Sequence, residues 1–146
     1  MTTANATMEK FGFPGTLIRD LAHWCILLRP AQVTLGSLVL VCKNPAKAFA
    51  EISPEAFSEL AVASKEIETN LKSFCQFEKI NYMMLMMVDP DVHFHVLPRY
   101  EGSRRFAGED FEDTGWPGLP DLASGQMLDD KIRANMTHAL KDSWLA

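Results

Sequence analysis

The stretch that decides the fold spans residues 91–99 and reads Asp91-Val92-His93-Phe94-His95-Val96-Leu97-Pro98-Arg99. Polar and apolar residues alternate in its first part. This pattern is typical of a β-strand with one buried face, because successive strand side chains point to opposite sides. Asp91, His93 and His95 therefore share one face. Two imidazoles and a carboxylate on one strip favour a functional site over a merely polar outer face.

Three other segments also have strand patterns. Residues 16–29 predict two strands joined at Asp20-Leu21-Ala22, and the aliphatic run 37–42 predicts a central strand buried on both faces. Residues 79–87 predict a strand in which four methionines serve as flexible core filler. The compact turn Val88-Asp89-Pro90 should then join this strand to the histidine strand as an antiparallel hairpin.

Two amphipathic helices are expected. The first begins after residues 45–52, a short helix or loop, with Ser53 as its cap and Pro54 as its first residue. Its predicted buried stripe is Phe57, Leu60, Ser64, Ile67, Leu71 and Phe74. The second covers residues 128–144, with Leu128, Ile132, Met136, Leu140 and Trp144 recurring every four residues.

Two segments have little regular pattern. Residues 1–15 predict a loosely ordered arm or one helical turn. Residues 101–118 are rich in Gly, Pro and charge, and they predict a long irregular segment that walls the site, because it leaves the strand that carries the histidines. We therefore expect an α+β fold: a single domain over residues 1–146, with a core at about 16–100 and an extension at 101–146.

Composition limits the classes of function. The chain has 146 residues and a formal net charge of -5, which argues against a nucleic-acid partner, because binding to a phosphate backbone needs positive charge. No apolar run approaches the roughly 20 residues that span a bilayer, and the start lacks a secretion-signal pattern, so we expect a cytoplasmic protein with no membrane partner. Cys25, Cys42 and Cys75 read as reduced packing residues.

The histidine strip predicts phosphorus chemistry. A histidine acts as a nucleophile when one ring nitrogen is held as a donor and the other aims its lone pair at an electrophile. A second imidazole two residues along the same face lies about 6–7 Å away, within reach of an oxygen on the same phosphate chain. This spacing supports covalent transfer in two displacement steps.

Residues 93–99 resemble the closing part of the histidine triad motif, His-x-His-x-His followed by apolar residues and often Pro-Arg. The resemblance extends over about residues 16–100: residues 36–41 are similar to the family's Gly-His-x-Leu-Val strand, and Asn81 lies in the strand before the motif. It implies a histidine-triad-like antiparallel sheet of about five strands covered by one long helix, commonly in a homodimer. It also implies attack by His93 on the α-phosphate of a nucleoside or dinucleoside phosphate, with His95 near the phosphates and no cofactor.

The departures from the motif bear on activity. Asp91 occupies the first triad position but keeps the backbone carbonyl that orients the nucleophilic ring in the family. Ser37 replaces the histidine after the strand glycine, and residues 88–90 replace the family's phosphate-binding loop. Arg99, Arg104 or Arg105 could compensate for the lost phosphate contacts. The proposed substrate-binding residues are Asp91, Asn81, Ser37 and Arg99. The pattern is most similar to bacterial histidine-triad-like hydrolases with a shortened hairpin and a Trp-Pro tail, here Trp116-Pro117.

Two alternatives stay open. One is a nucleotide-binding homodimer that lost catalysis with the loop contacts. The other is a metal-binding protein in which Asp91, His93 and His95 supply ligands from one strand. Three consecutive same-face residues rarely converge on one ion, so the metal alternative ranks lower.

Overall fold

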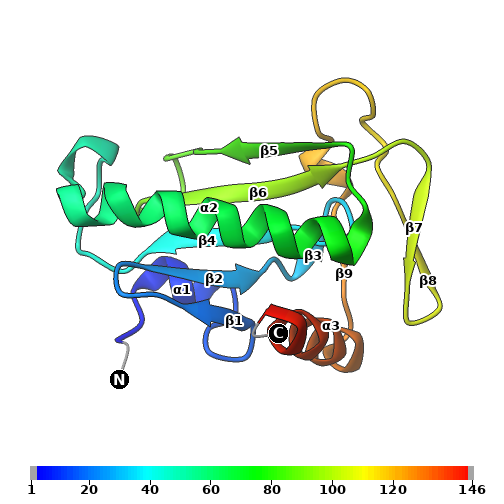
Figure 1. Cartoon of the computed structure of the whole chain (residues 1–146), viewed down its shortest axis with the longest axis horizontal. Coiled ribbons are helices and arrows are strands. Elements are labelled where there is room, and N and C mark those ends of the chain that lie inside the picture. The colour runs from blue at the N-terminus through cyan, green and yellow to red at the C-terminus, as the bar shows by residue number, and fades with distance from the viewer. Residues whose placement is uncertain (1–2, 145–146) are drawn as a thin grey trace.

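The computed structural model describes residues 3–144. Its centre is a five-stranded antiparallel sheet in the order β1-β2-β4-β6-β5, which confirms the predicted α+β fold (Figure 1). The strands are β1 (Leu17–Asp20), β2 (Trp24–Leu28), β4 (Leu38–Cys42), β5 (Lys79–Met83) and β6 (His93–Arg99). As predicted, β4 is central and buried along its whole length.

The long helix α2 (Pro54–Cys75) covers one face of this sheet (Figure 1). Ser53 is its cap, since its hydroxyl accepts a hydrogen bond from the Ala56 amide at 3.1 Å. The predicted buried stripe is wrong at its first residue, because Ala56 is buried and Phe57 is 40% exposed. The buried residues of the helix are Ala56, Ala63, Ile67, Leu71 and Cys75. The helix lies close to the sheet at this point, because the indole N–H of Trp24 donates to the Ala56 carbonyl at 2.8 Å.

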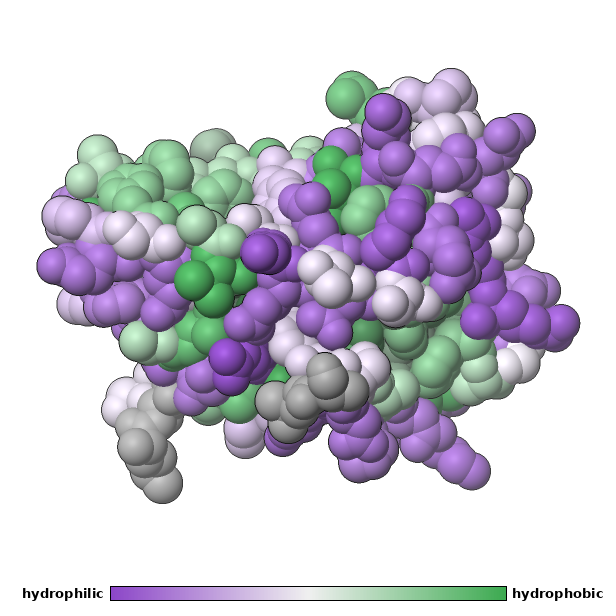
Figure 2. Space-filling view, viewed as in Figure 1, coloured by the Kyte–Doolittle hydropathy of each residue, from purple (hydrophilic) through white to green (hydrophobic). Residues whose placement is uncertain are grey.

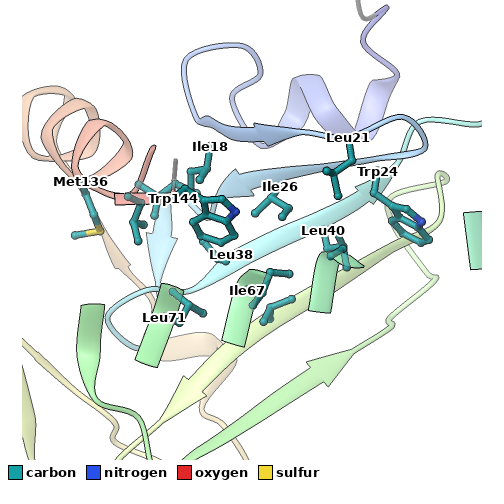
Figure 3. Packing of buried hydrophobic residues seen from close by; sticks show 14 of the residues in the cluster. Ile18, Leu21, Trp24, Ile26, Leu38, Leu40, Ile67, Leu71, Met136 and Trp144 are labelled. Carbon is teal, nitrogen blue, oxygen red and sulfur yellow. The ribbon is translucent and has the colours of Figure 1, made fainter. Parts of the chain in front are cut away.

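The main core lies between α2 and the sheet and continues to the C-terminal helix α3 (Asp130–Trp144). Figure 3 shows Ile26 and Leu40 of the sheet facing Ile67 of α2, with Trp144 and Met136 extending the cluster from α3. The predicted stripe of α3 holds, although Leu128 is buried just before the helix begins. Since α3 packs along β1 and β2, it covers the β1 edge of the sheet.

A second, smaller cluster lies on the other face of the sheet. The short helix α1 (Ala6–Lys10) and Phe11 meet Cys25 and Leu27 of β2 and Val39 and Val41 of β4 there. Asn5 caps α1, since its side-chain oxygen accepts from the Met8 amide at 2.9 Å. The first fifteen residues thus contain the single helical turn that was one of the two expectations for them, and this turn is packed on the sheet.

Strand β5 is shorter than predicted. It ends at Met83, and Met87 is 90% exposed, so the interpretation of this methionine as core filler is wrong. The predicted antiparallel pairing of β5 with β6 is confirmed, with Met83 opposite His95. Residues 84–92 connect the two strands in place of a three-residue turn.

The segment predicted to be irregular contains regular structure. Strands β7 (Ser103–Phe106) and β8 (Glu109–Glu112) form a hairpin, and Ala107 and Gly108 both have positive φ, as a two-residue hairpin turn requires. Farther on, η2 (Leu122–Ser124) leads to β9 (Gln126–Met127), which pairs with β3 (Ala31–Gln32). A short 3-10 helix, η1 (Phe49–Glu51), precedes α2 in the region where a helix or loop was expected.

Two features bear on the composition-based expectations. Cys25, Cys42 and Cys75 are buried free thiols, and burial raises the pKa of Cys25 and of Cys75 to about 12. Among residues 3–144, no helix is both long enough and apolar enough to cross a membrane.

Candidate active site

His93 lies on β6 and faces α1, on the side of the sheet away from α2. Its Nδ1 lies 2.7 Å from the backbone carbonyl oxygen of Asp91. A carbonyl only accepts, so Nδ1 carries a hydrogen, and in the neutral ring Nε2 keeps its lone pair. His93 is 0% exposed, and its Nε2 is a buried atom without a hydrogen-bond partner in the described chain.

His95 stands next to His93 on the same face, as the alternation predicted. The two ring centroids are 5.2 Å apart and the rings are nearly perpendicular. His95 is 7% exposed, and its Nδ1 lies 3.3 Å from Nε of Arg29. Burial lowers the pKa of His95 to about 4, helped by the positive charge of Arg29. His95 is therefore neutral at physiological pH.

The carboxylate of Asp91 does not line the strip with the two imidazoles. It accepts hydrogen bonds from the Thr7 amide at 3.1 Å and the Thr7 hydroxyl at 3.0 Å, and it pairs with Lys47 at 2.6 Å. Burial acts to raise the pKa of Asp91, but the hydrogen bonds from Lys47 and Thr7 outweigh it and hold this pKa below its usual range. The first motif position thus acts through its backbone carbonyl on His93 and through its side chain on α1.

The N-terminal segment covers both histidines. The ring of Phe11 lies 5.6 Å from that of His95, edge to face, and 6.3 Å from that of His93. Lys10 pairs with Asp89 at 2.7 Å, which attaches the end of α1 to the loop before β6. Sequence reasoning missed this cover; the available signal was the apolar pair Met8 and Phe11 three residues apart beside a cap residue.

The other predicted substrate-binding residues lie elsewhere. Ser37 is fully buried, and its hydroxyl donates to the Thr34 carbonyl at 2.8 Å within one turn. Arg99 is four residues beyond His95 on β6, about 13 Å along the strand. It forms a two-pronged ion pair with Asp113 at 2.7 and 3.1 Å and donates to the Asn81 side chain at 2.8 Å.

The remaining arginines proposed to compensate for lost phosphate contacts also have structural neighbours. Arg104 lies over the Tyr100 ring at 4.4 Å and donates to the Cys75 carbonyl at the end of α2. Arg105 is an exposed residue of the hairpin beside Asp110. A cavity of about 680 Å³ adjoins Arg99 and Asn81 and is also lined by residues 116–120. The segment after β6 therefore walls the Arg99 end of the strand.

The metal alternative lacks a ligand cluster. Within residues 3–144, no three His, Cys, Asp or Glu side chains come together in a way that could hold an ion. The Asp91 carboxylate is engaged by Thr7 and Lys47, and the Nδ1 atoms of the two histidines have partners of their own.

Comparisons with known proteins identify the fold. No protein-family model and no curated protein matches the chain. Among solved structures, a histidine triad protein from Sinorhizobium meliloti 1021 is 21% identical with a TM-score of 0.74, covering 98% of this chain and 97% of that one. One from Marinobacter aquaeolei VT8 is 17% identical with a TM-score of 0.74, covering 99% and 97%.

A hypothetical histidine triad nucleotide-binding protein from Sulfolobus tokodaii is 14% identical with a TM-score of 0.69, covering 95% of this chain and 89% of that one. These likenesses extend over nearly the whole chain, so they include the five-stranded sheet and the strand β6 that carries the two histidines. The chain has the fold of the histidine triad proteins.

Proposed function

We propose that this protein is a nucleotide phosphohydrolase or nucleotidyl transferase that acts at the α-phosphate of a nucleoside or dinucleoside phosphate, with His93 as the nucleophile. One observation carries the proposal: the Asp91 carbonyl holds Nδ1 of His93 at 2.7 Å, which leaves the Nε2 lone pair free of any partner in the described chain. A nitrogen kept in this state is suited to attack phosphorus. The nucleotide-binding name of the Sulfolobus relative supports the substrate class.

The reaction has two displacements. Nε2 of His93 forms a bond to the α-phosphorus while the bond from that phosphorus to the leaving oxygen breaks. The imidazole N–H of His95 donates a hydrogen bond to the departing oxygen. Water, or the hydroxyl of an acceptor, then forms a bond to phosphorus and loses its proton to solvent. The N–P bond breaks and its electron pair returns to Nε2.

Access to His93 needs a movement of the N-terminal segment. Because His93 is 0% exposed, a phosphate reaches Nε2 only when Phe11 and α1 move away from the rings. The attachments that must yield are the Thr7–Asp91 hydrogen bonds and the Lys10–Asp89 ion pair. An apolar ring over an unpartnered acceptor is a costly arrangement, which favours exchange of the cover for a polar ligand.

The second candidate, a nucleotide-binding homodimer without catalysis, draws on the same fold, and we propose a dimer in either case. Among residues 3–144, the edge strand β5 pairs with β6 alone, whereas α3 covers the opposite edge. Beside the bare edge, Met87 and Val88 are 90% and 81% exposed. Figure 2 shows apolar surface gathered at the upper left, where β5 ends beside the first turns of α2. A second copy pairing along β5 would cover this surface.

One experiment separates the two candidates. The protein is incubated with diadenosine tetraphosphate and with a panel of nucleoside phosphates, and the products are separated by chromatography. Mononucleotide product that disappears in His93→Ala supports the covalent mechanism. Unchanged turnover in His93→Ala refutes it. Binding without turnover across the panel, seen as thermal stabilisation, favours the non-catalytic homodimer.

A further inference from the structure

Arg29 is the residue whose geometry extends the proposed function furthest. It follows β2 directly, and its half-buried guanidinium reaches across to β6. Its Nε–H points at Nδ1 of His95 over 3.3 Å, and Nη1 donates to the Ala31 carbonyl at 2.5 Å. Within residues 3–144 it has no ion pair with a carboxylate, in contrast to Arg99, which is neutralised by Asp113.

The contact between Arg29 and His95 fixes where the imidazole carries its hydrogen. A guanidinium has donors only, so its neighbour on the ring must be an acceptor. Nδ1 of His95 is then unprotonated, and the hydrogen of the neutral ring resides on Nε2. A protonated His95 would turn an N–H toward the N–H of Arg29. Two donors cannot form a hydrogen bond, and the two positive charges would repel each other.

The two histidines consequently hold opposite tautomers. His93 presents a bare Nε2 because a carbonyl holds its Nδ1 hydrogen, and His95 presents an Nε2–H because an arginine occupies its Nδ1 lone pair. One nitrogen can attack phosphorus while the other donates to an oxygen of the same phosphate. Neither role requires the triad's missing first histidine.

We infer that Arg29 is a positioning residue, which sets the tautomer of His95 and keeps its ring neutral so that Nε2–H donates to the phosphate or its leaving oxygen. The inference rests on the proposed function for its role in turnover, whereas the tautomer itself is independent of activity. Lysine would not replace Arg29, since the guanidinium binds Ala31 and His95 with two separate nitrogens of one rigid plane.

Other charged groups also face His95. The positive charges of Arg29 and Lys10 and the neighbouring His93 act to lower the pKa of His95, and Asp89 acts to raise it. Lys10 is already paired with Asp89, and His93 sits on the same strand. Arg29 is the one group of this set that both carries a permanent charge and hydrogen-bonds the ring.

The test reads the tautomer directly. The full-length protein, labelled with ¹⁵N at histidine, is titrated by long-range ¹H–¹⁵N correlation spectroscopy from pH 8 down to about one unit below the expected midpoint, and the His95 signals are assigned from the His95→Gln variant. We expect the Nε2–H tautomer in the unmodified protein and a midpoint near 4. An Nδ1–H tautomer in the unmodified protein overturns the inference without any variant.

The matched variants are Arg29→Met, Arg29→Lys and Arg105→Met, the last on the exposed hairpin. Arg29→Met should move the His95 midpoint toward its ordinary value of 6.5 and mix the tautomers, and Arg29→Lys should mix the tautomers with a smaller change of midpoint. Arg105→Met should change neither. A His95 midpoint and tautomer in Arg29→Met equal to those of the unmodified protein overturn the inference.

Turnover separates this inference from the proposed function. With diadenosine tetraphosphate as substrate, Arg29→Met should lower kcat by about 100-fold with little change in KM, because the lost donor acts on the transition state. A shifted tautomer in a protein that turns over none of the panel leaves Arg29 as a positioning residue and refutes the proposed reaction. Full kcat in a variant with the shifted tautomer refutes the catalytic role of the positioning.

Discussion

Thr7 and Asp91 lie 84 positions apart in the chain and share three hydrogen bonds: the amide and the hydroxyl of Thr7 donate to the Asp91 carboxylate, and the Asp91 amide donates to the Thr7 hydroxyl. Asp91 also supplies the carbonyl that orients His93. Asp91 therefore connects His93, the proposed nucleophile, to the segment that covers it.

Thr7→Val should loosen this cover. The variant loses the hydroxyl but keeps the shape of the side chain, so the free energy of unfolding should fall by about 1–3 kcal/mol, as expected for a buried hydrogen bond. His93 should become more reactive toward diethyl pyrocarbonate, which peptide mass mapping measures. Thr69→Val, at an exposed position of α2, is the control. Equal protection of His93 in both variants would contradict the role of Thr7.

Asp91→Asn should destabilise the protein in a pH-dependent way. The folded-state pKa of Asp91 lies below the ordinary value of 3.8, so the carboxylate contributes stability that is present above pH 3.8 and is lost as the pH falls through the folded value. The difference in unfolding free energy between the variant and the unmodified protein should thus shrink below pH 4. Denaturant titrations at pH 7 and pH 3 measure it. A difference that is constant with pH would count against the ion pair with Lys47.

His95→Gln should remove a second pH dependence. The folded-state pKa of His95 is near 4 and the ordinary value is 6.5, so the unfolded chain binds one more proton between these limits. Stability should therefore fall as the pH drops from 6.5 toward 4. Denaturant midpoints across this window should slope less in His95→Gln. His138→Gln, at an exposed position of α3, should keep the full slope.

Arg99→Met should cost far more stability than a surface change. Its ion pair with Asp113 is buried on both sides, and removal of one partner leaves an uncompensated charge, with an expected loss of about 3–5 kcal/mol. Chemical unfolding measures the loss, and Arg105→Met provides the exposed comparison. The double variant Arg99→Met with Asp113→Leu should recover part of the lost stability. A loss of the same size in Arg105→Met would show that burial of the pair is not the cause.

Met87→Lys should weaken the proposed dimer. A lysine beside the bare β5 edge places like charges across a two-fold contact and makes the apolar surface polar. Sedimentation velocity at several concentrations should show a shift toward monomer. Met127→Lys changes a methionine that is 69% exposed on β9, away from this edge, and should leave the association unchanged. If Met87→Lys and Met127→Lys associate equally, the dimer interface does not lie at the β5 edge.

Much of the fold could be predicted because its patterns are local. The capped start of α2 and the aliphatic run of β4 depend on neighbouring residues, and both were confirmed. The β7–β8 hairpin was missed because its strands carry mostly charged side chains and contribute one fully buried residue, Phe111, so no periodic apolar signal exists.

The site was less predictable because it is assembled from distant segments. Alternation alone placed His93 and His95 on one face of a strand. Nothing local indicates that Phe11 and Arg29 contact the histidines or that Thr7 and Lys47 hold Asp91, since these residues come from three different parts of the chain. Arg99 is named as a substrate-binding residue from the Pro-Arg ending of the motif, and the structure places it beyond the rings along β6, paired with Asp113.

The three-way contact of Thr7, Lys47 and Asp91 has a consequence for natural sequence variation. The hydroxyl at position 7 and the cation at position 47 are the two side chains that hold the Asp91 carboxylate, beside the backbone amide of residue 7. In homologous chains these three positions should therefore vary as a set, and chains with histidine at position 91 should be free to place apolar residues at position 7.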